Sequence, residues 1–137
     1  MENLPSIIKI IKQHYPDIQA IYIFGSYGTE YETTESDVDI ALLLPPHIYK
    51  TLKKVPISDC RYELEDVLER TVDLINLRLV STVFQNEIIA SGKKIYCADT
   101  SAIDDFEALT LSYYQKLNEE IKFILQDIKE CGRILSI

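Results

Sequence analysis

A Gly-Ser turn between two apolar segments constrains the fold of this chain more than any other feature. The apolar segment 18–24 runs into Gly25-Ser26, and after ten intervening residues an Asp-Val-Asp motif beginning at Asp37 opens a second apolar segment. Short apolar runs bounded by turn residues are typical of buried strands. The sequence therefore predicts a strand, a Gly-Ser turn, a polar connection and a second strand.

The residue types of this motif suit a nucleotide and its metal ion. The backbone amides and the hydroxyl of a Gly-Ser turn can hold phosphate oxygens. Asp37 and Asp39 lie two residues apart on a strand, so their carboxylates share one face, and paired hard oxygen ligands suit Mg²⁺ or Mn²⁺. An isolated Asp-x-Asp more often ends a turn with solvated side chains. The preceding Gly25-Ser26 and the following apolar strand favour a site for a nucleoside triphosphate and its metal.

The same motif resembles the signature of the minimal nucleotidyltransferases, small relatives of the DNA polymerase β superfamily, in which a Gly-Ser pair, ten residues and Asp-x-Asp follow one another. Downstream, the segment 71–77 looks like the family strand that supplies a third carboxylate, here Asp73. The segment 84–96 is similar to the following helix and closing strand. The resemblance covers about residues 5–97. Within the family, the chain resembles the MntA-type antitoxins, which are encoded beside HEPN-domain toxins.

The resemblance implies a role for each of these residues. Asp37, Asp39 and Asp73 would hold two Mg²⁺ ions, one on the triphosphate of ATP and one on the acceptor hydroxyl. Asp73 would complete the second metal site and take the proton of that hydroxyl. Gly25 would let the backbone approach the triphosphate, and Ser26 would donate its hydroxyl or its amide to it.

The connection between the two strands leaves one role open and departs once from the family. Tyr27 either stacks on adenine or packs beside the Gly-Ser turn. Many relatives carry Arg-Gly shortly after the Gly-Ser pair, whereas this chain has Thr29-Glu30 there. An arginine that would help to bind phosphate is therefore missing, but the three aspartates are present. We expect an active enzyme.

The MntA-type antitoxins are implied to be enzymes that transfer AMP from ATP to a tyrosine of a HEPN ribonuclease toxin and so neutralise it. We expect this chain to be such an adenylyltransferase, with the toxin as its protein partner. Two alternatives remain: a nucleotidyltransferase acting on a small, aminoglycoside-like molecule, and a non-catalytic antitoxin that acts by binding and occlusion. The intact carboxylates argue against occlusion alone, because occlusion does not need them.

Composition and charge narrow the class of protein. At 137 residues the chain is predicted to be one domain, and 47% hydrophobic residues argue against a disordered chain. The net charge of −8 argues against direct nucleic-acid binding, which needs clustered basic residues, and fits a basic protein partner better. No segment approaches the ~20 apolar residues that cross a bilayer, and the N-terminus does not resemble a signal peptide. We expect a cytoplasmic protein.

The alternation of apolar segments predicts an α/β sheet with helices on one side, and the family resemblance implies a nucleotidyltransferase fold with a small mixed sheet. Pro45 and Pro46 end the second strand, since proline cannot continue a paired strand. Gly92 is expected to stop the helix before it. The predicted helices are 4–14, 57–70 and 81–90, and the predicted strands are 18–24, 37–44, 71–77 and 93–97.

The last segment, about 101–135, is predicted as a helical extension of the domain. A single helix of this length would measure roughly 50 Å, more than a small domain needs, so a bend or a break is expected within it. Its apolar stripe either packs on the sheet or, in its distal half, contacts a partner. The stripe comprises Phe106, Leu109, Tyr113, Leu117, Ile121, Ile124, Ile128 and Cys131.

Overall fold

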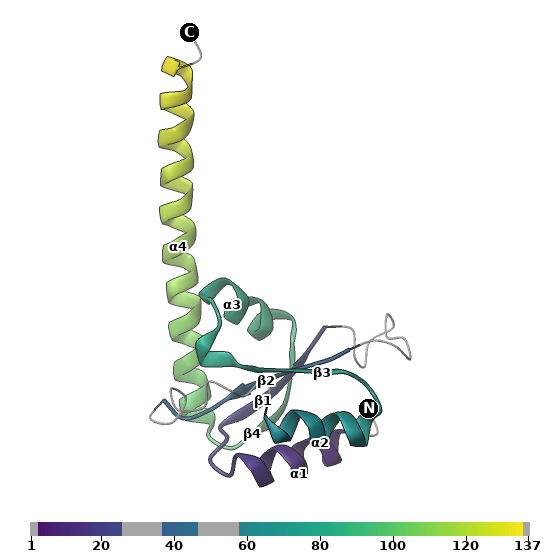
Figure 1. Ribbon diagram of the computed structural model, residues 1–137. Coiled ribbons are helices and arrows are strands. Elements are labelled where there is room, and N and C mark those ends of the chain that lie inside the picture. Colours follow the sequence, from purple (N-terminus) through teal and green to yellow (C-terminus); the bar gives the residue numbers. More distant parts are fainter. Residues whose placement is uncertain (1–2, 26–36, 47–57, 136–137) are drawn as a thin grey trace.

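The structure, a computed structural model, describes residues 3–25, 37–46 and 58–135, with the backbone alone for 130–135. Helices and strands alternate along the chain (Figure 1). In chain order the elements are α1 (Leu4–His14), β1 (Ala20–Phe24), β2 (Val38–Leu43), α2 (Asp59–Leu68), β3 (Val72–Asn76), the 3₁₀ turn η3 (Leu77–Leu79), α3 (Thr82–Ser91), β4 (Lys93–Cys97) and α4 (Thr100–Leu135).

The four strands form one mixed sheet in the order β3-β2-β1-β4. β1 pairs antiparallel with both β2 and β4, whereas β2 and β3 run parallel. Parallel neighbours need a crossover connection rather than a hairpin, and α2 lies within that connection. The crossover brings the third predicted strand directly beside the second.

Helices α1 and α2 lie against one face of the sheet (Figure 1), and a closed apolar core fills the space between them and the strands. Ile21 of β1 and Ile40 and Leu42 of β2 are fully buried there, against Ile7 of α1 and Leu64 of α2. Alternate residues of a strand share a face, so each strand sends every second side chain into this core. The side chains of this core are therefore closed to solvent and stabilise the fold.

The opposite face is covered by α3 and by the first turns of α4. Tyr22 of β1 and Leu43 of β2 are buried there together with Ile88 of α3 and Ile103 of α4. Strands β1 and β2 therefore send apolar side chains to both faces of the sheet, which is the pattern of a sheet covered on both faces.

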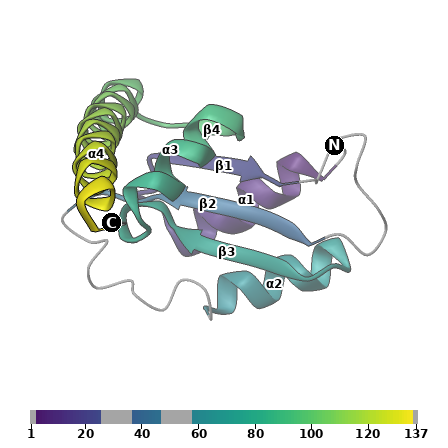
Figure 2. The same ribbon diagram turned by 90° about the horizontal axis from the view of Figure 1, so that it is seen from above.

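The predicted α/β class and the small mixed sheet are confirmed, but the expectation that helices lie on one side is wrong. Helices cover both faces (Figures 1 and 2). The physical reason is visible in β2, where Ile40, Ala41, Leu42 and Leu43 follow one another without a polar residue. Leaving either side of such a strand uncovered would expose apolar surface to water.

α4 is one unbroken helix of 36 residues, about 54 Å long at 1.5 Å per residue, so the expected bend or break is absent. No glycine or proline occurs before Gly132 to interrupt it. Its first turns pack on the domain and the remainder projects from it (Figure 1). Within the described part of the chain, no helix combines the length and the apolar character needed to cross a membrane.

Polar contacts fix the packed part of α4 to the sheet. The hydroxyl of Tyr22 donates to Oε1 of Glu107 at 2.8 Å, and Nζ of Lys94 on β4 lies 2.9 Å from the same oxygen. The guanidinium of Arg78 lies 5.1 Å from the ring centroid of Phe106 and donates to the carbonyl oxygen of Leu44. The direction in which α4 leaves the domain is therefore set by side chains from β1, β4 and η3.

Candidate active site

The three predicted carboxylates lie at one corner of the sheet. Asp37 directly precedes β2, Asp39 is the second residue of β2, and Asp73 is the second residue of β3. In the parallel β2–β3 pair, Asp39 is the register partner of Asp73. Register partners on adjacent strands project to the same face, with the strands about 4.8 Å apart. The structure therefore brings together all three aspartates that the sequence singled out.

These carboxylates disturb one another electrostatically. Burial raises the pKa of Asp39 above its ordinary value, and the negative charges of Asp73 and Asp37 raise that pKa further. Asp39 is half-buried, whereas Asp37 and Asp73 are exposed. Removing water from one carboxylate and placing two others beside it destabilises its ionised form. A bound divalent cation would reverse this effect.

The three aspartates fit Mg²⁺ by their chemistry. All of them offer hard carboxylate oxygens, which this ion prefers over nitrogen or sulfur ligands. Among the residues that the structure describes, no three His, Cys, Asp or Glu side chains already converge as a metal-binding group. Ion binding would therefore require the aspartate side chains to turn toward one another across the β2–β3 pair.

Gly25 lies against this corner because β1 ends there. Phe24 is the register partner of Asp39, and the next residue, Gly25, turns with a φ of +75°. A Cβ on Gly25 would stand 2.2 Å from Oδ2 of Asp39. Glycine is thus required both by the backbone conformation and by the carboxylate, and the turn passes directly beside Asp39. The other predicted nucleotide-binding residues, Ser26 and Tyr27, lie outside the described residues, as do Thr29 and Glu30.

A pocket of about 550 Å³ opens between the end of β1 and α3, beside the Gly25 turn. The rings of Phe24 and Phe84 meet edge to face in it, with their centroids 5.8 Å apart. This pocket was not predicted from the sequence. The signal that could have indicated it is the apolar pair Val83 and Phe84 at the start of α3, because both side chains are exposed. The lining residues are Phe24, Gly25, Ser81, Val83, Phe84, Glu87 and Ser91.

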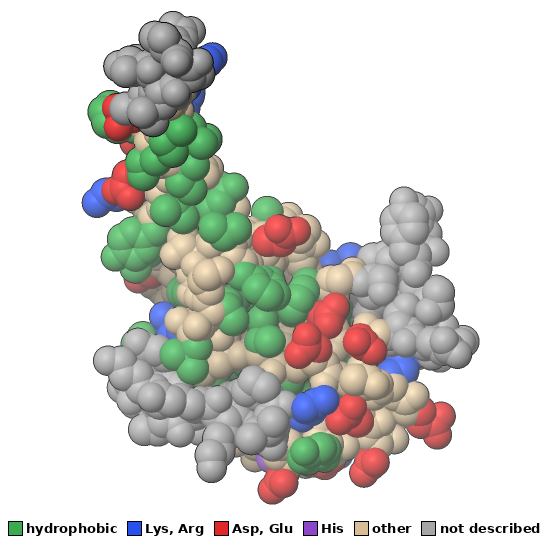
Figure 3. Space-filling view, turned by 45° about the horizontal axis from the view of Figure 1, so that its top comes forward, with side chains coloured by type: hydrophobic (Ala, Val, Ile, Leu, Met, Phe, Trp, Pro, Cys, Tyr) green, Lys and Arg blue, Asp and Glu red, His purple; other side chains and the backbone are tan. Residues whose placement is uncertain are grey.

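Pocket and carboxylates share one face of the sheet. Phe24 follows Tyr22 by two residues and Asp39 precedes Ala41 by two, and both Tyr22 and Ala41 belong to the core under α3 and α4. In the space-filling view, hydrophobic side chains occupy the centre of the molecule and continue along α4, with acidic side chains beside them (Figure 3). The site therefore combines an apolar cavity with an anionic corner.

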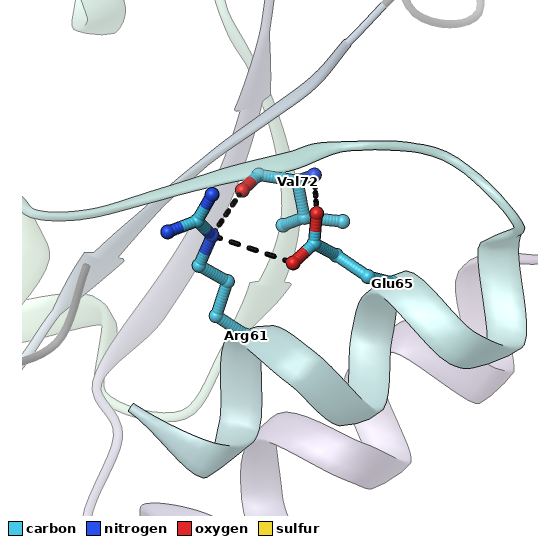
Figure 4. A network of polar contacts seen from close by, with 3 residues as sticks. All are labelled: Arg61, Glu65 and Val72. Carbon is cyan, nitrogen blue, oxygen red and sulfur yellow. Dashed lines mark hydrogen bonds and ion pairs between the residues drawn. The ribbon is translucent and has the colours of Figure 1, made fainter. Parts of the chain in front are cut away.

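A polar network on α2 holds the start of β3 (Figure 4). Nε of Arg61 donates to the carbonyl oxygen of Val72 at 2.9 Å, and the Val72 N–H donates to Oε2 of Glu65 at 3.2 Å. Arg61 and Glu65 also form an ion pair, with 3.5 Å between Nε and Oε1. Both backbone groups of Val72 are thus fixed from outside the sheet, which sets the position of the next residue, Asp73. Sequence reasoning missed these two residues.

Comparison with known proteins gives consistent matches. The family model described as "Polymerase beta, Nucleotidyltransferase" matches residues 6–101. Protein adenylyltransferase MntA of Shewanella oneidensis is 34% identical over 127 residues, which are 92% of this chain and 87% of that protein. A putative protein adenylyltransferase of Methanocaldococcus jannaschii is 31% identical over 81 residues, 55% of this chain and 79% of the relative.

Solved structures agree with these sequence matches. The crystal structure of a toxin–antitoxin with AMP-PNP has a chain that superposes with a TM-score of 0.71 at 31% identity, covering 92% of this chain and 98% of that chain. The structure of a tri-AMPylated Shewanella oneidensis HEPN toxin in complex with MNT antitoxin gives a TM-score of 0.66 at 29% identity, covering 92% and 95%.

Proposed function

Because the chain belongs to the polymerase β nucleotidyltransferase family, we propose that it transfers AMP from ATP to a tyrosine hydroxyl of a HEPN-domain toxin and thereby neutralises that toxin. Its relative MntA is named a protein adenylyltransferase. A related solved structure contains an AMPylated HEPN toxin, and another was obtained with AMP-PNP. ATP as the substrate would place the reaction in the cytoplasm.

One observation carries the proposal: Asp39 and Asp73 are register partners on the same face of the sheet, with the Gly25 turn directly beside Asp39. A glycine turn without a side chain leaves room for the triphosphate at the backbone, and adjacent carboxylates suit the ion that accompanies it. An occluding protein would gain nothing from a half-buried carboxylate whose pKa is raised by burial and by two like charges. This arrangement therefore supports catalysis over occlusion alone.

Each step of the proposed AMP transfer can be assigned to a residue of this chain or to the ion that it would hold. Mg²⁺ held by Asp37, Asp39 and Asp73 would supply charge neutralisation and a lowered pKa of the acceptor hydroxyl. The hydroxyl oxygen forms a bond to the α-phosphorus, the bond from that phosphorus to the β-phosphate bridge breaks, and pyrophosphate leaves. Asp73, at the exposed edge of the site, receives the hydroxyl proton and passes it to water. Gly25 admits the triphosphate close to the backbone.

The pocket beside α3 suits the nucleoside part of ATP. Its walls include two aromatic rings that offer apolar surface to a base, and the carboxylate of Glu87 on its rim can accept hydrogen bonds from ribose hydroxyls or a base amine. The pocket opens beside Gly25, so a nucleoside within it leaves its phosphates next to Asp39.

The test is the intact mass of the cognate HEPN-domain toxin after incubation with the chain, ATP and Mg²⁺. The wild type should add whole AMP units, Asp39→Asn should add none, and fragment spectra should locate them on tyrosine. Asp66→Asn is the matched control, because Asp66 is an exposed aspartate of α2. It should transfer AMP like the wild type.

The two alternative functions give different results in the same experiment. Neutralisation of the toxin by Asp39→Asn, without any mass gain in either reaction, would identify an occluding antitoxin. AMP transfer to an aminoglycoside, with the toxin unmodified, would identify a small-molecule nucleotidyltransferase. Either result would refute the proposed function.

A further inference from the structure

The apolar face of α4 continues beyond the domain. Residues that share one side of this helix are buried where it meets the sheet, half-buried as it passes α3, and exposed beyond that point. The buried members are Ile103, Phe106 and Thr110, the half-buried members are Tyr114 and Leu117, and the exposed members are Ile121, Ile124 and Ile128. We call the five residues from Tyr114 to Ile128 in this set the α4 seam.

The spacing of the seam residues along the sequence indicates that a helix packs against them. From Tyr114 to Ile128 the intervals between members are three, four, three and four residues. This alternation is the signature of a helix that packs against another helix along its length. The exposed fractions of 43% for Ile121, 54% for Ile124 and 59% for Ile128 show that the domain itself supplies no such helix. The seam is therefore an interface that the described residues leave open.

The seam faces the side of the molecule that carries the candidate active site. The buried residues that precede the seam on the same side of α4, Ile103 and Phe106, pack in one core with Tyr22 of β1 and Ile88 of α3. A seam with this spacing drifts by only about 20° per heptad on a straight helix, so its exposed part keeps nearly the same direction. A helix lying on it would lie beyond α3, on the same side of the sheet as Asp39 (Figure 1).

Charge decides between a second copy and a different protein. Glu120 and Asp127 are exposed and flank the seam at positions that meet the partner in a helix pair. In an antiparallel pair of identical chains these acidic residues would face each other, and each copy carries a net charge of −8. A helix with Lys or Arg beside its apolar residues would instead form ion pairs with them.

We propose that the α4 seam docks an apolar helix of the HEPN-domain toxin flanked by basic residues, and that this docking holds the acceptor tyrosine over Asp39 and Asp73. The inference rests on the proposed function for the identity of the partner. Docking on the same side as the carboxylates would hold the tyrosine hydroxyl close to the bound nucleotide, so that the two groups react within one complex. The projecting half of α4 is then a substrate-recognition element.

The test compares two exposed sites on one helix. Ile121→Glu with Ile124→Glu places charges in the seam, whereas Phe123→Glu changes a 75% exposed aromatic residue that points away from it, because successive helix residues are about 100° apart. We expect the double variant to bind the toxin at least about 100-fold more weakly by calorimetry, as loss of central apolar anchors does. Phe123→Glu should bind like the wild type.

Three results would overturn the docking proposal. They are unchanged toxin binding by the double variant, an equal loss with Phe123→Glu, and concentration-dependent self-association of the wild type that the double variant abolishes. Circular dichroism of each variant confirms the fold, which exposed positions should leave intact. Asp39→Asn separates docking from the proposed function, because it should bind toxin normally without transferring AMP. Normal binding through the seam by a wild type that transfers no AMP would refute the function and leave the docking standing.

Discussion

The two faces of the sheet perform different tasks with the same strands. Under α1 and α2, Val38, Ile40 and Leu42 of β2 are completely buried in a closed core. On the other face, Asp39 precedes Ala41 and Leu43, and the helices cover only the latter two. Strand alternation thus places core residues and the carboxylate that we propose to act in catalysis one position apart. Neighbouring substitutions in β2 should therefore have opposite consequences.

The largest effect is expected for Asp39→Asn on the open face. AMP transfer should fall about 10³-fold, since an ion-binding carboxylate contributes several kcal/mol to the transition state and each 1.4 kcal/mol is tenfold in rate. In EDTA the variant should melt at the same or a higher temperature, because burial and two like charges destabilise the ionised Asp39. Single-turnover mass analysis and thermal melting measure the two quantities. A clear loss of stability would assign Asp39 to the structure instead.

Ile40→Ala, on the face under α1 and α2, should have the opposite effect, with lower stability and unchanged activity. A fully buried isoleucine cut to alanine costs about 2–5 kcal/mol of unfolding free energy, because a cavity remains in the core. The kcat of the remaining folded protein should stay close to that of the wild type. Urea titration measures the stability, with exposed Ile124→Ala as the matched control that should unfold like the wild type. A folded Ile40→Ala protein without activity would contradict the separation of the two faces.

A smaller effect is expected for Glu65 of α2, which holds the backbone of Val72 next to Asp73. Glu65→Ala removes the acceptor of the Val72 N–H and should lower kcat about tenfold with KM unchanged, as losses behind a metal ligand commonly do. Glu65→Gln, which keeps an acceptor oxygen, should recover most of the rate. Asp66→Ala, one residue away and exposed, serves as the control. A loss of stability without any change in kcat would limit Arg61 and Glu65 to holding the fold.

The smallest effect concerns pH and the anchoring of α4. Burial, and then the hydrogen bond to Glu107, raise the pKa of Tyr22. The unfolded state therefore loses this proton first, so the stability contribution of Tyr22 is complete below a pH of about 10 and declines as the pH rises above it. Tyr22→Phe should remove part of that decline, at a cost of about 1 kcal/mol at neutral pH for the lost hydrogen bond. Urea unfolding at several pH values measures both. An equal decline in both proteins would assign it to other groups.

Local patterns were sufficient to predict most elements and the Asp37–Asp39 pair, whereas the family resemblance was needed to add Asp73 to the cluster. The Asp37–Asp39 pair needed only strand alternation, and Asp73 needed the family strand that the parallel register then placed beside Asp39. The shorter observed strands and the longer α4 differ by residues at their ends, where side-chain contacts rather than periodicity decide.

Long-range contacts explain what the sequence did not reveal. The pocket depends on Phe24 meeting Phe84 sixty residues later along the chain, and no local pattern encodes that distance. Arg61 and Glu65 look like an ordinary ion pair one helical turn apart until α2 is placed against Val72. Helices cover both faces of the sheet because its strands are apolar on both sides. Periodicity identifies such strands but does not show which helix packs against which face.

The contacts of Val72 also bear on how the protein behaves at high concentration. β3 is an outer strand of the sheet, and an outer strand with unpaired N–H and C=O groups is a template for adding strands from other molecules. Arg61 and Glu65 occupy both groups of Val72 with charged side chains from the chain's own helix. The same pair therefore protects this edge against intermolecular strand addition, and its loss should promote aggregation as well as slow the reaction.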